Sequence, residues 1–427
     1  MASDRVKESN AQSCYTRSNL GAEDHARERP MKRWLVVLGV AMAMLAAACD
    51  NNGNEACPTT TPCPTCAPCP GSPTATATGT AVATRTAVRG TATPSPTPSP
   101  TPMAMAEVFV DHADFPVSLA FAPDGRLFYN ELRTGRVRIV ENGRLQDEPF
   151  ASLQVVSLSG YSEHGLLGLA LDPDFASNHY VYVFYSEPDK NGDPLRQRLV
   201  RFTEVDGVGQ DMTVILDNLP IGKLCCHNGG RIAFGPDGKL YVSIGDTEES
   251  RLSQDPQSLA GKILRINPDG SVPDDNPFGG SPVYALGIRN SFGLAFHPVT
   301  GALFIDETGP SGFDELDIIQ PGGNYGWPEA QGIAGRSQYI DPIWTSGPVS
   351  VTPTGMTFYT GDVLIPKNDL LRCSWNNGKL EHVLMAPSFD HIDGIEDTGL
   401  ACSLDVKMGP DGALYFSTTD TIYRWGS

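Results

Sequence analysis

A histidine and an aspartate stand in two glycine-rich segments that each border a short apolar run. His227 lies in Cys225-Cys226-His227-Asn228-Gly229-Gly230-Arg231, and Asp246 ends the segment Ser243-Ile-Gly-Asp. A carboxylate that binds an imidazole orients the ring, so that its other nitrogen can take a proton from a hydroxyl group. The pair is therefore a candidate general base with its partner. A purely structural role for both residues is the alternative.

The elements that must position this pair form an internal repeat. An apolar run, Pro-Asp-Gly or a variant, and a second run rich in Leu, Tyr, Val and Phe recur at roughly 50-residue spacing. Each copy predicts a β-hairpin, because Pro-Asp-Gly supplies turn dihedrals between two short buried strands. The copies begin at Leu119, Leu169, Ile232, Leu294, Gly355 and Val406.

Six such hairpins predict an all-β fold, namely a six-bladed β-propeller of four-stranded antiparallel blades. A β-sandwich is the structural alternative, but it would not repeat one hairpin phrase six times. Ligands of propellers bind over the central channel, at loops that leave the inner strands. We therefore expect the candidate base and its partner to lie at the channel mouth.

The bulk composition limits the partners. The chain has 427 residues and a formal net charge of −19. Such an acidic chain offers little basic surface to neutralise phosphates, which argues against a nucleic-acid partner. Residues 107–427 are long enough for one large propeller, and the composition suits a protein that handles small, mostly neutral ligands.

Residues 1–49 are expected to be an N-terminal extension and a lipoprotein signal peptide. Lys32-Arg33, an apolar run over residues 34–48 and Cys49 follow one another in that order. The run is shorter than the ~20 residues of a membrane span. We predict export, lipidation at Cys49 and a membrane contact through that lipid alone, at the cell surface or in the periplasm. Cleavage after Ala48 without lipidation is the alternative.

Residues 50–106 are expected to be a disordered tether. Their composition is dominated by Thr, Pro, Ala, Gly and Ser, which cannot bury enough apolar surface to offset the entropy of ordering. Four cysteines within the segment suit local disulfides or crosslinks in an oxidising compartment better than a zinc site, because no second ligand pair follows. They are Cys57, Cys63, Cys66 and Cys69.

Several motifs of residues 107–427 together resemble the glucose/sorbosone dehydrogenase family, which includes soluble aldose dehydrogenases that use pyrroloquinoline quinone (PQQ). His227-Asn-Gly-Gly-Arg-Ile, with the hairpin that ends in Ile-Gly-Asp246, is the most specific of them. The others follow in family order: Gly165-Leu-Leu-Gly-Leu-Ala170, Gly287-Ile-Arg-Asn290, Glu307-Thr-Gly-Pro310, Asp314-Glu-Leu316 and Asn324-Tyr-Gly-Trp-Pro328.

The resemblance implies a role for each matching residue. It makes His227 the catalytic base and Asp246 its carboxylate partner. Glu163 falls where the family has a glutamine that touches the sugar. The implied cofactor and metal positions are Arg289 and Asn290, which would bind the quinone, and Gly309 and Pro310, whose backbone carbonyls would hold a calcium ion beside PQQ.

Three positions depart from the family pattern. Asn376 replaces a lysine that contacts the quinone, and Cys402 and Leu404 replace two arginines. Because PQQ carries three carboxylates and each charge-assisted bond contributes roughly 1.5–3 kcal/mol, these losses imply an affinity several decades lower. Arg372 or Lys407 could compensate, although strand alternation should direct Lys407 away from the pocket.

The remaining cysteines lie near the same positions. If the strands of Cys373 and Cys402 both border the pocket, as the resemblance implies, a disulfide can join them across it in an oxidising compartment. Two unrelated buried thiols are the alternative. Adjacent Cys225 and Cys226 could form a vicinal disulfide beside His227, which suits them better than a metal site.

Two functions follow from these observations. In the first, the chain is an oxidoreductase in which His227 deprotonates a sugar or polyol hydroxyl, while hydride passes to PQQ or another quinone and then to an external electron acceptor. In the second, it is a surface propeller that binds a sugar or another ligand without catalysis. The intact His-Asp and Arg-Asn elements favour the first, and the three lost cations favour the second.

Overall fold

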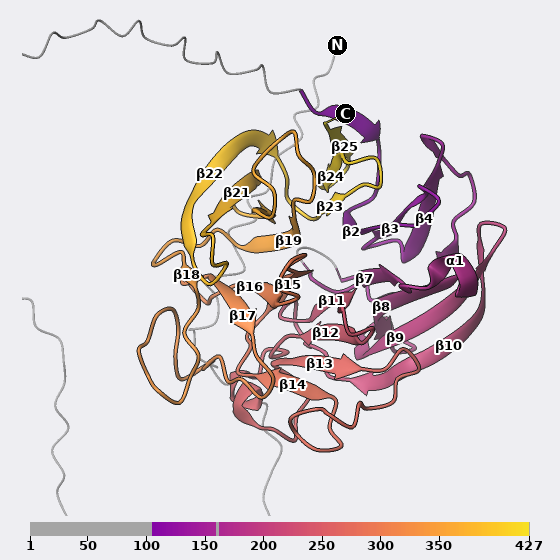
Figure 1. Ribbon diagram of the computed structural model, residues 1–427. Coiled ribbons are helices and arrows are strands. Elements are labelled where there is room, and N and C mark those ends of the chain that lie inside the picture. Colours follow the sequence, from indigo (N-terminus) through magenta and orange to yellow (C-terminus); the bar gives the residue numbers. More distant parts are fainter. Residues whose placement is uncertain (1–104, 159–161, 427) are drawn as a thin grey trace, which may run out of the picture. The chain divides into compact units, whose positions relative to one another are not determined.

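The computed structural model describes residues 105–158 and 162–426, which form six antiparallel sheets around a central channel (Figure 1). The strands of each blade are given from the inside outward. Blade 1 contains β2 (Pro116–Phe121), β3 (Leu127–Glu131), β4 (Arg136–Glu141) and β5 (Arg144–Leu145), and β6 (Ala151–Ser152) also pairs with β4. Blade 2 contains β7 (Leu166–Leu171), β8 (Tyr180–Pro188), β9 (Pro194–Val205) and β10 (Val208–Leu219), and blade 3 contains β11 (Gly229–Phe234), β12 (Leu240–Ile244), β13 (Lys262–Ile266) and β14 (Val283–Leu286).

Blades 4 and 5 have the same order. They contain β15 (Ser291–Phe296), β16 (Leu303–Glu307), β17 (Glu315–Ile319) and β18 (Trp344–Thr345); β19 (Pro353–Phe358), β20 (Leu370–Ser374), β21 (Lys379–Met385) and β22 (Ile392–Ala401). Within the described ranges, helix is confined to α1 (Phe175–Asn178) and a 3₁₀ turn at Ser250–Gln254. No helix there has the length and apolarity needed to cross a membrane.

The ring closes between the two ends of the described chain. Blade 6 contains β23 (Val406–Met408), β24 (Leu414–Ser417) and β25 (Ile422–Trp425), and its outermost strand is β1 (Glu107–Val110). Glu107 pairs with Arg424 in an antiparallel register. The predicted six-bladed propeller is thereby confirmed. The predicted signal peptide, the lipidation site Cys49 and the tether with its four cysteines, up to residue 104, lie outside the described residues.

The repeated hairpins owe their shape to the Pro-Asp-Gly turns. In blade 1, the N–H of Ala122 donates to the carbonyl of Arg126, and the N–H of Gly125 donates back to the carbonyl of Ala122. Gly125 has φ +92°, which a residue with a Cβ rarely adopts. Apolar residues on both flanking strands then pack between blades, where each fully buried large side chain contributes roughly 1.5–3 kcal/mol.

The antiparallel order determines where functional loops can lie. The segment before each inner strand and the loop between the second and third strands come to the same end of the channel. His227 precedes β11, Arg289 precedes β15, and Asp246 follows β12. Residues separated widely in sequence therefore meet at one mouth.

Candidate active site

His227 and Asp246 form a hydrogen-bonded pair. The Nδ1 atom of His227 lies 2.7 Å from Oδ1 of Asp246, whose side chain is almost fully buried. The indole N–H of Trp327 donates to the other carboxylate oxygen over 2.9 Å. Burial raises the pKa of Asp246, but the hydrogen bonds from His227 and Trp327 hold it below its ordinary value. Ionised Asp246 thus keeps the proton of His227 on Nδ1 and leaves Nε2 as an acceptor.

Arg289 faces that second nitrogen. Its Nη2 atom lies 2.8 Å from Nε2 of His227, and its Nη1 atom donates to the carbonyl of Thr308 over 2.6 Å. The backbone N–H of Arg289 donates to Oε1 of Glu307, also over 2.6 Å. The Thr308 carbonyl therefore holds the guanidinium next to the atom that would accept a proton, and Glu307 holds the backbone of the same residue.

Glu163 links the base to blade 4. One of its carboxylate oxygens accepts the backbone N–H of His227 over 2.6 Å and the side-chain amide of Asn290 over 3.1 Å. Asn290 in turn accepts the N–H of Gly229 through its side-chain oxygen. Burial raises the pKa of Glu163, and His227 and Asn290 oppose the rise. Glu163, His227 and Asn290 thus meet although three different blades supply them.

Gly309 and Pro310 form a tight turn after β16. A Cβ atom on Gly309 would lie 2.0 Å from the carbonyl oxygen of Gly312, so glycine alone fits there. The buried carboxylate of Asp314 accepts the N–H of Gly309 over 2.8 Å and fixes the turn. Gly309 and Pro310 line one cavity with Arg289 and Trp327. Carbonyl oxygens in such a turn suit a hard cation such as calcium.

Three carboxyl groups lie behind this turn on one buried face of β16 and β17. Glu307 lies opposite Glu315 in the register, and Asp317 follows two residues later on β17. Burial raises the pKa of all three, that of Glu315 to about 7. This part of blade 4 therefore retains protons at pH values where exposed carboxyls are ionised.

Sequence reasoning did not identify two residues that hold the pair. Trp327 was noted only within the motif Asn-Tyr-Gly-Trp-Pro, and its indole contact with Asp246 comes from the long connection between β17 and β18. Glu248, two residues after Asp246, belongs to none of these motifs. Its N–H donates to Oδ1 of Asp246 over 2.9 Å. Its position two residues after Asp246 was the one feature of the sequence that could have indicated a role for Glu248 at the site.

Comparison with known proteins agrees with this arrangement. The glucose/sorbosone dehydrogenase family model matches residues 113–424. The chain belongs to the glucose/sorbosone dehydrogenase family. Aldose sugar dehydrogenase YliI of Escherichia coli is 31% identical over 341 residues, which cover 74% of this chain and 90% of the relative.

Two further similar proteins are described by names that refer to a quinone cofactor. Quinoprotein glucose dehydrogenase B of Acinetobacter calcoaceticus is 34% identical over 263 residues, or 55% of this chain and 54% of that protein. The PQQ-bound aldose sugar dehydrogenase of Streptomyces coelicolor has a TM-score of 0.64 and 30% identity, covering 76% of this chain and 99% of that one.

The positions that depart from the family pattern supply no cation to the mouth. The amide nitrogen of exposed Asn376 donates to the carbonyl and the hydroxyl of Ser350. Leu404 is buried. Cys402 is bonded to Cys373, and both side chains are fully buried in the apolar core formed by blades 5 and 6. The bond therefore lies inside this core and does not cross the pocket as the sequence had suggested.

The two cations suggested as substitutes are already engaged. The guanidinium of Arg372 is buried, pairs with Asp306 over 3.0 Å and with Glu381 over 2.8 Å, and stacks on a tryptophan ring. The ammonium of Lys407 donates to the carbonyl of Met356 and lies 3.5 Å from Asp405. Arg372 as a substitute is wrong, because its charge is neutralised within the core.

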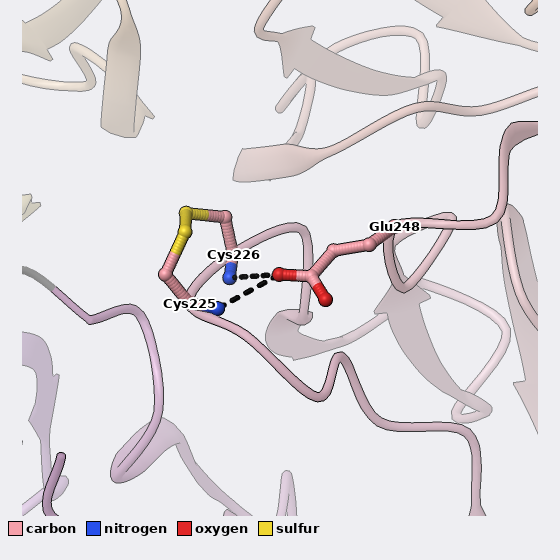
Figure 2. A group of neighbouring side chains, drawn as sticks. All are labelled: Cys225, Cys226 and Glu248. Carbon is pink, nitrogen blue, oxygen red and sulfur yellow. Dashed lines mark hydrogen bonds between the residues drawn. A yellow bond between two sulfur atoms is a disulfide. The ribbon is translucent and has the colours of Figure 1, made fainter. Parts of the chain in front are cut away.

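Cys225 and Cys226 are joined by a disulfide directly before His227 (Figure 2). With Glu248 they form the one group among the described residues whose ligand atoms are close enough to hold a metal ion. Both sulfurs are in the disulfide, so neither is a thiolate, and the carboxylate accepts the N–H groups of both cysteines. This arrangement is a hydrogen-bonded unit and not a metal site.

Proposed function

We propose that this family member oxidises a hydroxyl group of a sugar or another polyol, with a quinone as the oxidant. The observation that carries the proposal is the hydrogen bond between Nδ1 of His227 and Asp246, which leaves Nε2 as the acceptor at the channel mouth. The named activities of the relatives support the same reaction class, although fold and family alone do not assign a reaction.

Each residue of the site has a task in this reaction. Nε2 of His227 takes the proton of the substrate hydroxyl while hydride leaves the adjoining carbon. Asp246 stays ionised and stabilises the imidazolium that forms. Glu163 is placed to bind a second hydroxyl of the sugar, and it holds the backbone of His227 at the same time.

The residues fit the reacting end of PQQ better than its carboxylate end. Arg289 and Asn290 would hold the quinone, and the carbonyls of Gly309 and Pro310 would hold calcium beside it. When bound, PQQ supplies the two-electron acceptor, and calcium polarises its carbonyl group. Because Asn376, Cys402 and Leu404 bring no charge to its carboxylates, we propose that PQQ binds weakly and exchangeably.

The proposed reaction takes place outside the cytoplasm. An exported protein, tethered by a lipid at Cys49, would oxidise sugars outside the cytoplasm and pass electrons to an external acceptor. The disulfides at Cys225–Cys226 and Cys373–Cys402 suit such an oxidising compartment.

The test is aldose-dependent reduction of an artificial electron-accepting dye by purified protein supplied with PQQ and calcium. We expect turnover that requires both additions and rises with PQQ up to micromolar concentrations. No turnover at saturating PQQ would favour the second candidate function, a propeller that binds sugars without oxidising them. The uncharged residues at the three departing positions are the observation that supports that candidate.

A further inference from the structure

One carboxylate accepts several backbone hydrogen bonds from the loop that carries the candidate base. Glu248 accepts four consecutive N–H groups, two on each oxygen. The donors and distances are Lys223 at 3.0 Å and Leu224 at 2.9 Å on Oε2, and Cys225 at 2.7 Å and Cys226 at 2.9 Å on Oε1. We call these four N–H groups with the carboxylate the amide clamp.

The disulfide gives this clamp its form. A bond between adjacent cysteines closes a small ring around their shared peptide, which limits the dihedrals of both residues. Figure 2 shows both N–H groups of this ring directed at the Glu248 carboxylate, with the sulfurs on the side away from it. Hydrogen bonds to an ionised acceptor are roughly twice as strong as neutral ones. The loop before His227 is thus held by covalent and charge-assisted restraints together.

The backbone around the clamp needs such restraint. His227 has φ +57°, and Thr247 and Glu248 have φ +54° and +69°. Residues with a Cβ rarely adopt this left-handed region, and each instance costs of order 1 kcal/mol or more. The N–H of Thr247 also donates to the carbonyl of His227 over 3.0 Å. The two strained segments therefore support each other.

Glu248 reaches both members of the candidate pair. Its side chain holds the loop that ends in His227, and its own N–H donates to Oδ1 of Asp246. The same oxygen accepts the hydrogen bond from Nδ1 of His227. A change in the Glu248 side chain would therefore release the loop that carries His227, while the backbone N–H that binds Asp246 would remain.

We propose that Glu248 is a positioning residue that, through the amide clamp, holds the His227 ring in the orientation in which Asp246 fixes its tautomer. The kinetic part of this proposal rests on the proposed dehydrogenase function. The structural part does not, because ring tautomer and amide protection can be measured without turnover. Glu248 does not line the cavity beside Arg289, and its hydrogen bonds go to backbone N–H groups of the loop and to Asp246, so it acts through its neighbours.

The substitution Glu248→Gln tests the clamp. Glutamine has one carbonyl oxygen and presents N–H donors where the second carboxylate oxygen stood, so two of the four amides lose their acceptor. Because small misplacements of a base cost roughly tenfold to a hundredfold in rate, we expect kcat to fall at least tenfold and KM for the sugar to change less than threefold. Glu249→Gln is the matched control, since Glu249 is exposed and its side chain pairs with the exposed Arg251.

Nitrogen NMR of the His227 ring and hydrogen exchange of the loop amides supply the second readout. In the unaltered protein we expect a single Nδ1–H tautomer and slow exchange at Lys223, Leu224, Cys225 and Cys226. Glu248→Gln should mix the tautomers and speed exchange at these four amides, and Glu249→Gln should do neither. Glu248→Asp, which keeps the charge on a shorter side chain, serves if the glutamine variant does not fold, with the same direction of change.

The outcomes separate the two proposals. An unchanged tautomer and unchanged exchange in the Glu248 variants would overturn the clamp, whatever the activity. A rise in KM with kcat intact would also overturn it, because that pattern indicates lost substrate binding. Absent dye reduction in the unaltered protein, together with tautomer mixing in Glu248→Gln, would overturn the dehydrogenase function and support the clamp.

Discussion

The guanidinium of Arg289 lies 2.8 Å from Nε2 of His227, on the side of the ring opposite Asp246. With an acceptor on one side of the ring and a donor on the other, the ring has no place for a second proton: Nδ1 donates to Asp246, and Nε2 accepts from Arg289. Arg289 must therefore turn away before Nε2 can meet a substrate hydroxyl. A negatively charged or quinone ligand next to Arg289 would supply the reason for that turn.

Replacing Arg289 by Met should weaken PQQ binding by about tenfold to a hundredfold, the equivalent of one charge-assisted contact. Calorimetric titration with PQQ and calcium measures this directly. Arg251→Met, at an exposed arginine that pairs with Glu249, is the control and should bind as the unaltered protein does. Equal affinity in Arg289→Met would place the quinone away from this residue.

Adding charge at one of the departing positions should strengthen PQQ binding. We expect Asn376→Lys, at an exposed position, to raise the affinity about tenfold, the equivalent of one charge-assisted contact. Cys402 and Leu404 are left unchanged, because both are buried and an arginine at either position would be buried too. A variant that binds no better than the unaltered protein would refute the charge argument.

The Cys373–Cys402 disulfide should contribute about 2–4 kcal/mol to the free energy of unfolding, because it joins two residues that are 29 positions apart and so restricts the unfolded chain. The double change to Ala avoids leaving a buried polar group, and urea denaturation measures the loss. The Cys225→Ala, Cys226→Ala variant is the control. It removes a bond between neighbours, so its loss should be much smaller, and an equal loss in both variants would contradict the loop-closure explanation.

Glu315 should make the folded state less stable as the pH rises. Burial, with Asp314 and Asp341, raises its pKa from 4.5 to about 7. Between pH 4.5 and about 7 the unfolded chain has lost a proton that the folded chain retains. The free energy of unfolding therefore falls as the pH rises through this range, and it falls no further through this group above about pH 7. Glu315→Gln should therefore raise the melting temperature at pH 8, in buffer with EDTA, and have little effect at pH 4.

Exposed Glu329 provides the comparison for that measurement. Glu329→Gln should leave the melting temperature nearly unchanged at both pH values, because its side chain is exposed and surface substitutions usually change stability by no more than about 0.5 kcal/mol. If Glu315→Gln changed the melting temperature equally at pH 4 and pH 8, its effect would come from packing and not from the charge.

The hairpins could be predicted because their signals are local. Pro-Asp-Gly and its flanking apolar runs lie within about ten residues of one another, so the sequence alone identifies the turn and both strands. The partner of β1 could not be predicted, since Glu107 pairs with Arg424 at the far end of the chain and nothing nearby indicates it.

The candidate site was predictable to the extent that motifs resemble a family. His227 and Asp246 stood out through such motifs, and the structure places them 2.7 Å apart. The roles of Arg372 and Glu248 could not be predicted in this way. Arg372 lies in β20 and directs its side chain between blades, where it pairs with Asp306 of β16, a strand distant in the sequence. Glu248 reaches its four amides through a backbone turn with positive φ, which sequence patterns of non-glycine residues do not indicate.

The proposed reaction depends on the removal of a sugar hydroxyl proton by His227. Its most direct test is the initial rate of aldose-dependent dye reduction by His227→Asn, measured at saturating PQQ and calcium beside the unaltered protein. We predict a rate at least about a hundredfold lower, with PQQ still bound and the β-sheet circular dichroism unchanged, because general-base catalysis contributes ~10²–10⁴ in rate. A variant that turned over at nearly the original rate would show that His227 is not the base.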